Sequence, residues 1–257
     1  MNDHLNSSQI KKRLGRSTVP VVQVFDQIDS TQTYCLRQHF IRPHLVVADH
    51  QNQGHGQRGH RFYSPRANGI YMTVTLPAST RFLQRPGVLT AGIGVAVVQA
   101  LLPLVRHRMG LKWMNDLYCR RRKCGGFLVE TSGNSQNQIQ SWVIGIGLNL
   151  YPQHFPHAIQ SRAGYLFDRH SAVSRNQLIA RIYNQLVRIP HVSNQLIITR
   201  YRQLMIWRHC KVRYRLAGQA RLGTVLGVDN RVRLIVKDRF HHLHHLNYQN
   251  AQQIRLA

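Results

Sequence analysis

The chain has 257 residues, and 35 lysine and arginine residues against 9 aspartate and glutamate residues give it a formal charge of +26 at pH 7. Because 43% of the residues are hydrophobic, the chain can bury one or two cores, which excludes an intrinsically disordered protein. Four cysteines without CxxC spacing exclude a small disulfide-stabilised secreted scaffold, and the N-terminus has no apolar signal segment. These features predict a cytoplasmic protein.

The first part of the chain predicts strands and helices in alternation. Residues 1–18 are polar and basic and are predicted to be a connector. The β-branched run 20–28 indicates a strand, and Asp29-Ser30 then supplies N-cap chemistry for a helix that reaches Phe40. Residues 44–51 indicate a second strand.

A third strand is expected at 69–76, followed by an apolar segment at 87–105. That segment has the length of a membrane span, but its glycine, glutamine and proline residues favour a helix buried in a protein core. The runs 111–119 and 125–131 predict a hairpin around the arginine-rich turn at 120–123.

The remaining elements divide into a buried strand, a helical stretch and a small β module. Residues 141–150 are apolar on both faces, which is typical of a central strand. Helical periodicity covers 174–206, and short alternating strands follow from Lys211. The sequence therefore predicts an α+β fold, with a mixed-sheet domain at 19–207 and an all-β domain at 208–257.

The charge has two interpretations that the sequence leaves open. Of the 35 basic residues, 29 are arginine, and they are scattered along the chain, which fits a compositional bias. A polyanion partner would account for the same charge, although nucleic-acid binders usually concentrate charge on one face. Where arginine is the default cation, Lys112 and Lys123 mark positions at which an ammonium group matters.

Three motifs can carry chemistry, and each also has a plain structural interpretation. The loop GHGQRG at 54–59 can turn backbone N–H groups toward an anion, or be an ordinary surface loop. The segment KWMND at 112–116 combines a cation, an aromatic ring and an Asn-Asp pair, or is a strand followed by a turn. The glycines of GIGLN at 145–149 allow a ligand to approach closely, or belong to a glycine-tolerant core strand.

The histidine and cysteine residues give weaker evidence of a functional site than these three motifs. The histidines at 241–245 would split between the two faces of a strand, so a solvated polar strand is favoured over a metal site. Cys119 and Cys124 flank the arginine-rich turn and are expected to be structural rather than reactive.

The order of these motifs resembles the catalytic domain of biotin protein ligases, the enzymes that biotinylate biotin carboxyl carrier proteins. The resemblance rests on DST at 29–31, Gln51 with GHGQRG and a following SP, KWMNDLY with RRKCGGFLVE, and GIGLNL. It runs from about residue 20 to the end, since the β module resembles the SH3-like C-terminal domain of that family. It implies a mixed-sheet biotin/lipoate ligase fold followed by a small SH3-like β-barrel.

The resemblance also implies roles for individual residues. The catalytic residues would be Lys123 and Arg58. The residues that bind biotin would be Ser30, Thr31, Gln32, Gln51, Gly54, His55, Gly56, Gln57, Lys123 and Gly125. The residues that bind ATP or the adenylate would be Arg58, Gly59, Lys112, Trp113, Asn115, Asp116 and Asn149. Magnesium would enter with ATP near Asp116, without a protein cage of its own.

The implied reaction has two steps. ATP and biotin form biotinyl-5′-AMP and pyrophosphate, and a lysine of the carrier protein then attacks the mixed anhydride. The chain departs from the family pattern in having His55 and Gln57 where arginine is common, Met114 in place of proline, and Gln32 where asparagine often follows DST. The loss of two guanidinium groups predicts a loosely held adenylate.

Other functions remain open at this point. A lipoate ligase or acyltransferase of the same fold also uses a single lysine, and a nucleic-acid-binding module would exploit the charge. Only 28 residues precede Asp29, so an N-terminal winged helix is not expected, and neither is sequence-specific DNA binding. The predicted partner is an acetyl-CoA carboxylase type carrier protein; no membrane association is expected, and the chain would be a monomer or a weak homodimer.

Overall fold

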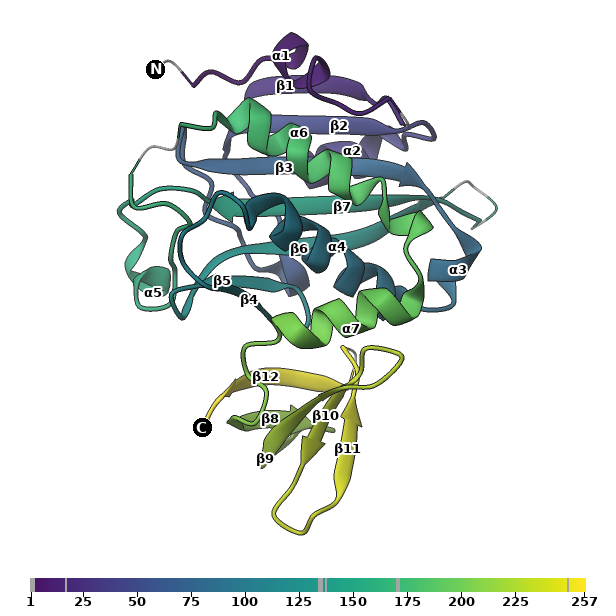
Figure 1. Cartoon of the computed structure of the whole chain (residues 1–257), viewed down its shortest axis with the longest axis vertical. Helices are drawn as coiled ribbons and strands as arrows, with labels where there is room; N and C mark the ends of the chain where they lie inside the picture. Colours follow the sequence, from purple (N-terminus) through teal and green to yellow (C-terminus); the bar gives the residue numbers. More distant parts are fainter. Residues whose placement is uncertain (1–2, 17, 134–135, 137, 170–171, 249) are drawn as a thin grey trace.

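The computed structural model describes residues 3–16, 18–133, 136, 138–169, 172–248 and 250–257. A seven-stranded mixed sheet forms the larger part of the fold and a five-stranded antiparallel sheet the smaller part (Figure 1). The larger sheet has the order β1-β2-β3-β7-β6-β5-β4. Its strands are β1 (Val21–Ile28), β2 (His44–Gln51), β3 (Gly69–Pro77), β4 (Met109–Lys112), β5 (Asp116–Cys119), β6 (Arg122–Gly133) and β7 (Ile139–Asn149).

Helices α4, α6 and α7 cover one face of this sheet (Figure 1). The central helix α4 is buried along almost its whole length, as the run at 87–105 predicted, and it packs against α6 and α7. Ser174 begins α6 with a capping box that includes Gln177, an arrangement that stabilises a helix start by about 1 kcal/mol. The helices are α1 (Ser7–Lys11), α2 (Thr31–Gln38), α3 (Thr80–Leu83), α4 (Pro86–Leu101), α5 (His157–Gln160), α6 (Arg175–Leu186) and α7 (Asn194–Leu204), with short 3-10 turns η1 (Gln57–Gly59) and η2 (Ile189–His191).

Helix α2 lies on the opposite face of the sheet. Its Cys35 packs with Val46 of β2 and Val143 of β7, whereas the neighbouring residues Val47 and Ile144 face the α4 layer. Successive side chains of a strand point to opposite faces, so Gly145 and Gly147 lie on the α2 side with Val143. The absence of side chains at these two positions leaves room on that face.

The smaller sheet has the order β11-β10-β9-β8-β12, in agreement with the predicted β module. Its strands are β8 (Lys211–Leu216), β9 (Gln219–Val228), β10 (Leu234–Lys237), β11 (Leu243–Leu246) and β12 (Ala251–Leu256). In the described part of the chain, no helix combines the length and the apolarity that crossing a membrane requires.

Four local predictions need correction. The segment 111–119 is not one strand, because β4 and β5 pair with each other at Lys112 and Asp116. The helix after Ser30 ends at Gln38, since His39 adopts a left-handed conformation. The stretch 174–206 forms two helices separated by η2, and the helix expected at 87–105 ends four residues early, at Leu101.

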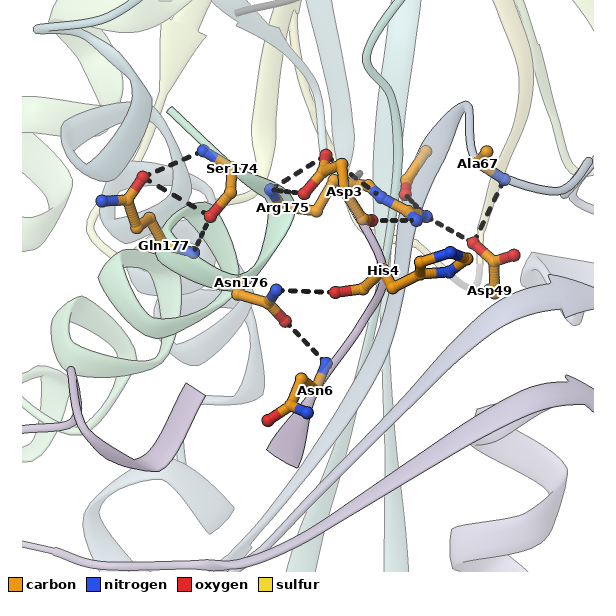
Figure 2. Close-up of polar contacts among 10 residues, drawn as sticks. Asp3, His4, Asn6, Asp49, Ala67, Ser174, Arg175, Asn176 and Gln177 are labelled. Atoms are coloured by element: carbon orange, nitrogen blue, oxygen red, sulfur yellow. Dashed lines mark hydrogen bonds and ion pairs between the residues drawn. The ribbon is translucent and has the colours of Figure 1, made fainter. Parts of the chain in front are cut away.

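The basic N-terminal segment is packed rather than free. Asn6 caps α1, and Ile10 is fully buried in the main core. Figure 2 shows the segment joined to α6 around Arg175, whose side chain is 2% exposed. The Nη1 atom of Arg175 lies 2.6 Å from Oδ1 of Asp49, and its Nη2 atom donates to the backbone oxygen of Asp3 at 2.7 Å.

The histidine run meets two carboxylates that the sequence analysis did not connect with it. His242 and His244 contact Asp238, and His245 contacts Asp229. The described residues contain no group of three or more potential metal ligands. Hydrogen bonds from the His244 side chain and from two backbone N–H groups lower the pKa of Asp238 to about 2.

We expect Asp238 to make the stability of the small sheet depend on acid. A carboxylate with a lowered pKa stabilises the fold above its unfolded pKa of about 4, and this contribution is lost as the pH falls toward 2. The melting temperature of Asp238→Asn should therefore fall less between pH 5 and pH 2 than that of the unaltered chain, as measured by circular dichroism. Asp26→Asn, at an exposed position of β1, is the control, and equal slopes for all three proteins would contradict the expectation.

Candidate active site

A cavity of about 490 Å³ opens on the α2 side of the sheet. Its size is in the range of small-molecule sites. All of the predicted site residues line it except Gly54 and Gly59. The sequence motifs, which are far apart along the chain, therefore meet around one space.

Small hydroxyl and amide groups form one end of the cavity. Ser30 caps α2 by accepting a hydrogen bond from the backbone N–H of Thr33, so its own hydrogen remains available. The Oε1 atom of Gln51 accepts from the backbone N–H of Thr31 at 2.9 Å and from its hydroxyl at 3.1 Å. Ser30, Thr31 and Gln51 are all buried, so this end can hold a polar ligand group without competition from bulk water.

The side-chain amide of Gln32 forms hydrogen bonds with protein groups on both its nitrogen and its oxygen. Its amide nitrogen donates to Glu130 at 2.8 Å and to the backbone oxygen of Val143 at 3.1 Å, and its oxygen accepts from Thr73 at 3.3 Å. Glu130 is the only glutamate of the chain, and its other oxygen lies 3.9 Å from Nε2 of His55. Gln32 lines the cavity, but its position indicates a supporting part in it.

Strand glycines line the cavity, and of these the predicted site residues included Gly125 but not Gly145 or Gly147. A Cβ atom at Gly145 would lie 2.6 Å from Oε1 of Gln32, and one at Gly147 would lie 2.8 Å from the ring of Phe62. Close approach by protein side chains is thus the reason for both glycines, whereas the sequence suggested either approach by a ligand or a glycine-tolerant core strand. The space around Gly125 is equally small, because a Cβ atom at this position would lie 2.6 Å from the backbone oxygen of Gly147.

The glycine-rich loop folds back on itself over the cavity. Phe62 donates its backbone N–H to the oxygen of Gly54, and His55 and Arg61 form a further antiparallel bridge. Tyr63 contacts Phe155 edge to face, which joins the loop to the segment before α5. The predicted site residues did not include these aromatic residues, although FYS at 62–64 begins three residues after Gly59.

Arg58 turns toward the small sheet instead of the lysine cluster. Its Nη2 atom donates to the backbone oxygens of Tyr248 and Ala251 at 2.6 and 3.2 Å, and its guanidinium group lies 4.5 Å from the centre of the Tyr248 ring. The small sheet thus engages the guanidinium group in this structure, and the predicted contribution of Arg58 to ATP binding stays a prediction. The observed partners lie 190 and 193 residues away in sequence.

Lys112, Asp116 and Lys123 form a compact cluster in the wall of the cavity. Nζ of Lys123 lies 2.6 Å from one oxygen of Asp116, and Nζ of Lys112 lies 3.7 Å from the other. Burial, with repulsion from Lys123, lowers the pKa of Lys112, although Asp116 opposes this change. Two ammonium groups and one carboxylate leave a net positive charge, which suits an anion better than a metal ion.

Most polar groups of the residues predicted to bind ATP already have hydrogen-bond partners within the protein. Asn115 donates to the backbone oxygen of Phe127, and Trp113 donates to that of Val232 in the small domain. Asn149 donates to Gly164, but its buried Oδ1 atom has no hydrogen-bond partner in the described structure. An unpaired buried acceptor in a cavity wall is the place where a ligand N–H or O–H is expected.

Known proteins share both the sequence pattern and the architecture. The profile of the Biotin/lipoate A/B protein ligase family matches residues 24–149. Residues 24–149 belong to this family. The chain is 30% identical to the Bifunctional ligase/repressor BirA of Escherichia coli over 189 residues, which are 71% of this chain and 56% of that protein. It is 28% identical to a biotin–acetyl-CoA-carboxylase ligase of Mycobacterium tuberculosis over 199 residues, 74% of this chain and 71% of that protein.

Solved structures extend the agreement to the small domain of this chain. The biotin protein ligase of Aquifex aeolicus in complex with biotin and ATP superposes with a TM-score of 0.77 at 21% identity, over 92% of this chain and 99% of that one. A Leishmania major enzyme in complex with biotinyl-5-AMP gives 0.61 at 21% identity, over 89% of this chain and 99% of that one. The chain spans about half the length of the BirA proteins that it matches.

Proposed function

We propose that the chain is an ATP-dependent biotin protein ligase, which forms biotinyl-5′-AMP and transfers biotin to a lysine of a carrier protein. The observation that carries the proposal is a single cavity that joins a buried hydroxyl and amide end to a cationic lysine cluster. The first end suits an uncharged polar ring system, and the second suits a carboxylate next to a phosphate. A lipoate ligase would use the second end but has no need of the first.

The lysine cluster would serve the first step. Biotin carboxylate and the α-phosphate of ATP repel each other, and Lys123 with Lys112 would offset that repulsion and stabilise the charge that develops as the anhydride forms. Magnesium would enter as part of the nucleotide substrate. Asp116 would hold both ammonium groups in place, since it contacts each of them.

The loop and the β module would complete the reaction chamber. Phe62 over Gly147 and Arg58 on Tyr248 bring the loop against both domains, which would keep water from the mixed anhydride. We therefore treat 19–207 as the catalytic domain and 208–257 as a domain that contributes cavity wall. The four cysteines carry no disulfide, which supports our placement of the reaction in the cytoplasm.

The direct test is ATP–pyrophosphate exchange with biotin or lipoate as the acid. Biotin-dependent exchange, followed by transfer of labelled biotin to a carrier domain, is the expected result. Lipoate-dependent exchange without a response to biotin would replace the proposal by the lipoate alternative, and no exchange with either acid would overturn it.

The carrier protein would meet a basic rim. His60, Arg61, Arg162 and Arg255 are exposed and line the cavity, while the segments 52–68 and 150–166 contain no acidic residue. At about 1 M salt the Debye length is about 3 Å, so attraction at an exposed rim is largely screened.

We expect kcat/KM for carrier biotinylation to fall about tenfold at high salt, well beyond the effect on pyrophosphate exchange. Arg61→Glu should slow transfer in the same selective way. Arg106→Glu, at an exposed position outside the cavity lining, provides the control. Equal salt sensitivity of the two half-reactions would contradict a role for the rim in docking.

The altered loop should hold the adenylate loosely. His55 and Gln57 line the cavity, and neither supplies the fixed positive charge of an arginine. Release of biotinyl-5′-AMP without carrier, followed by a filter assay, is expected to be about tenfold faster than from the double variant His55→Arg/Gln57→Arg. Equal release rates would show that these two positions do not control retention.

A further inference from the structure

Ser64 is a buried residue at the base of the glycine-rich loop that the reaction scheme does not use. It is 3% exposed and does not line the cavity. Its backbone oxygen accepts from the N–H of Gln51 at 3.2 Å, and its hydroxyl lies 2.8 Å from Nε2 of the same residue. Ser64 therefore stands directly behind a side chain that does line the cavity.

The direction of each hydrogen bond around Ser64 follows from its partners. The backbone oxygen of Phe62 can only accept, so the Ser64 hydroxyl donates its single hydrogen there, at 3.0 Å. The oxygen of Ser64 must then accept from Gln51, which places the amide nitrogen of Gln51 on this side. At the other end, the backbone N–H of Thr31 can only donate, so it requires the amide oxygen of Gln51.

Both ends thus fix the Gln51 amide in the same orientation. Its oxygen already accepts two hydrogen bonds from Thr31, while its nitrogen keeps one hydrogen beyond the bond to Ser64. The Ser30 hydroxyl beside it also has its hydrogen available, because its oxygen accepts from Thr33. This end of the cavity offers donors, and a ligand must meet them with an acceptor.

The backbone of Gly54 packs closely beside Ser64 and Gln51. A Cβ atom at Gly54 would lie 2.8 Å from Oγ of Ser64 and 3.1 Å from Nε2 of Gln51. Any side chain at position 54 would therefore disturb the hydrogen bond between these two residues. The backbone bond from Phe62 to Gly54 also closes the loop, so the acceptor that orients Ser64 is in place only when the loop is folded.

We propose that Ser64 is a positioning residue that orients the Gln51 amide and thereby makes the site select a carbonyl acceptor, the group that the ureido ring of biotin presents. This inference rests on the proposed function. It also makes ligand selection depend on the folded loop. The Ser64 hydroxyl donates to the backbone oxygen of Phe62 in the loop and accepts from the amide of Gln51 at the cavity.

The test compares biotin with 2-iminobiotin, in which a guanidine replaces the urea and offers hydrogens where biotin offers its carbonyl oxygen. Ser64→Ala leaves one N–H of Gln51 unpaired, so that only the bonds from Thr31 still hold the amide in its orientation. In pyrophosphate exchange, we expect KM for biotin to rise about tenfold with little change in kcat, and the preference for biotin over 2-iminobiotin to shrink by a similar factor. Ser64→Cys, which keeps the shape and a weak acceptor, should lie between the two proteins.

Ser132→Ala is the matched control, because Ser132 is a buried serine whose hydroxyl contacts His39 outside the cavity. A merely structural role for Ser64 would lower the active fraction with both acids equally, and an unchanged preference in a folded Ser64→Ala or Ser64→Cys variant would overturn the inference. If the unaltered chain showed no biotin-dependent exchange, the proposed function would fail and this inference with it, whereas exchange with an unchanged preference removes only the role of Ser64.

Discussion

Replacing Lys123 by alanine is expected to lower the rate of biotin-dependent pyrophosphate exchange by about 10²- to 10³-fold, the effect of removing one preorganised charge-stabilising group. Lys123 lies in the cavity wall, 2.6 Å from Asp116, at the place where two anions would have to meet. Its removal would leave Lys112 as the remaining cation of the cluster.

Two further variants separate the chemistry of Lys123 from its structural contact. Lys123→Arg keeps the charge and the partner Asp116 but replaces a compact ammonium by a planar group, so partial activity is expected. Lys211→Ala, at an exposed position of β8, should leave exchange unchanged. Full exchange in a folded Lys123→Ala protein would remove Lys123 from the reaction, whatever the activity of the other two variants.

Replacing Arg175 by methionine is expected to destabilise the protein by about 3 kcal/mol, because it removes a fully buried cation from two partly buried carboxylate groups. Arg175 contacts Asp49 and the backbone and side chain of Asp3. Asp49 keeps the exposed Arg66 at 3.3 Å and the N–H of Ala67, which moderates the loss. For a chain of this size, 3 kcal/mol corresponds to a melting temperature about 6–12 °C lower.

Thermal and urea unfolding followed by circular dichroism would measure this change. Arg66→Met is the matched control, since it removes an exposed arginine from the same carboxylate and should cost less than about 1 kcal/mol. If Arg175→Met were as stable as the unaltered chain, the desolvation of Arg175 would balance its ion pairs. The N-terminal segment would then be held mainly by Ile10 and the hydrogen bonds of Asn6.

The fold was predictable where hydrophobic patterning is strong. The segment at 87–105 and the β-branched strands at 44–51 and 141–150 are determined by burial, so periodicity identified them. The run at 111–119 was not predicted correctly, because the turn at 113–115 lies within a largely apolar stretch that was taken for one strand. Packing of the N-terminal segment depends on Arg175, which lies more than 160 residues away in sequence. A local sequence pattern cannot predict such a contact.

The residues of the site were likewise predictable only where the local backbone determines the residue type. Motifs with local backbone requirements, such as the glycines of 54–59 and 145–147, identify the positions that surround the cavity. Contributions from Tyr248, Ile254 and Arg255 could not be predicted, because they depend on how the small sheet sits against the larger domain. The contact of Arg58 with Tyr248 depends on the same placement of the small sheet, so it could not be predicted from the sequence either.

The position of β12 has a consequence for synthesis. Residues of this strand are translated after every other part of the cavity wall, and Ala251 and Arg255 occupy that wall only once β12 has paired with β8. A nascent chain that still lacks this strand is without one part of the cavity wall. Under the proposed function, ribosomal products that stop a few residues early would therefore expose the adenylate to water.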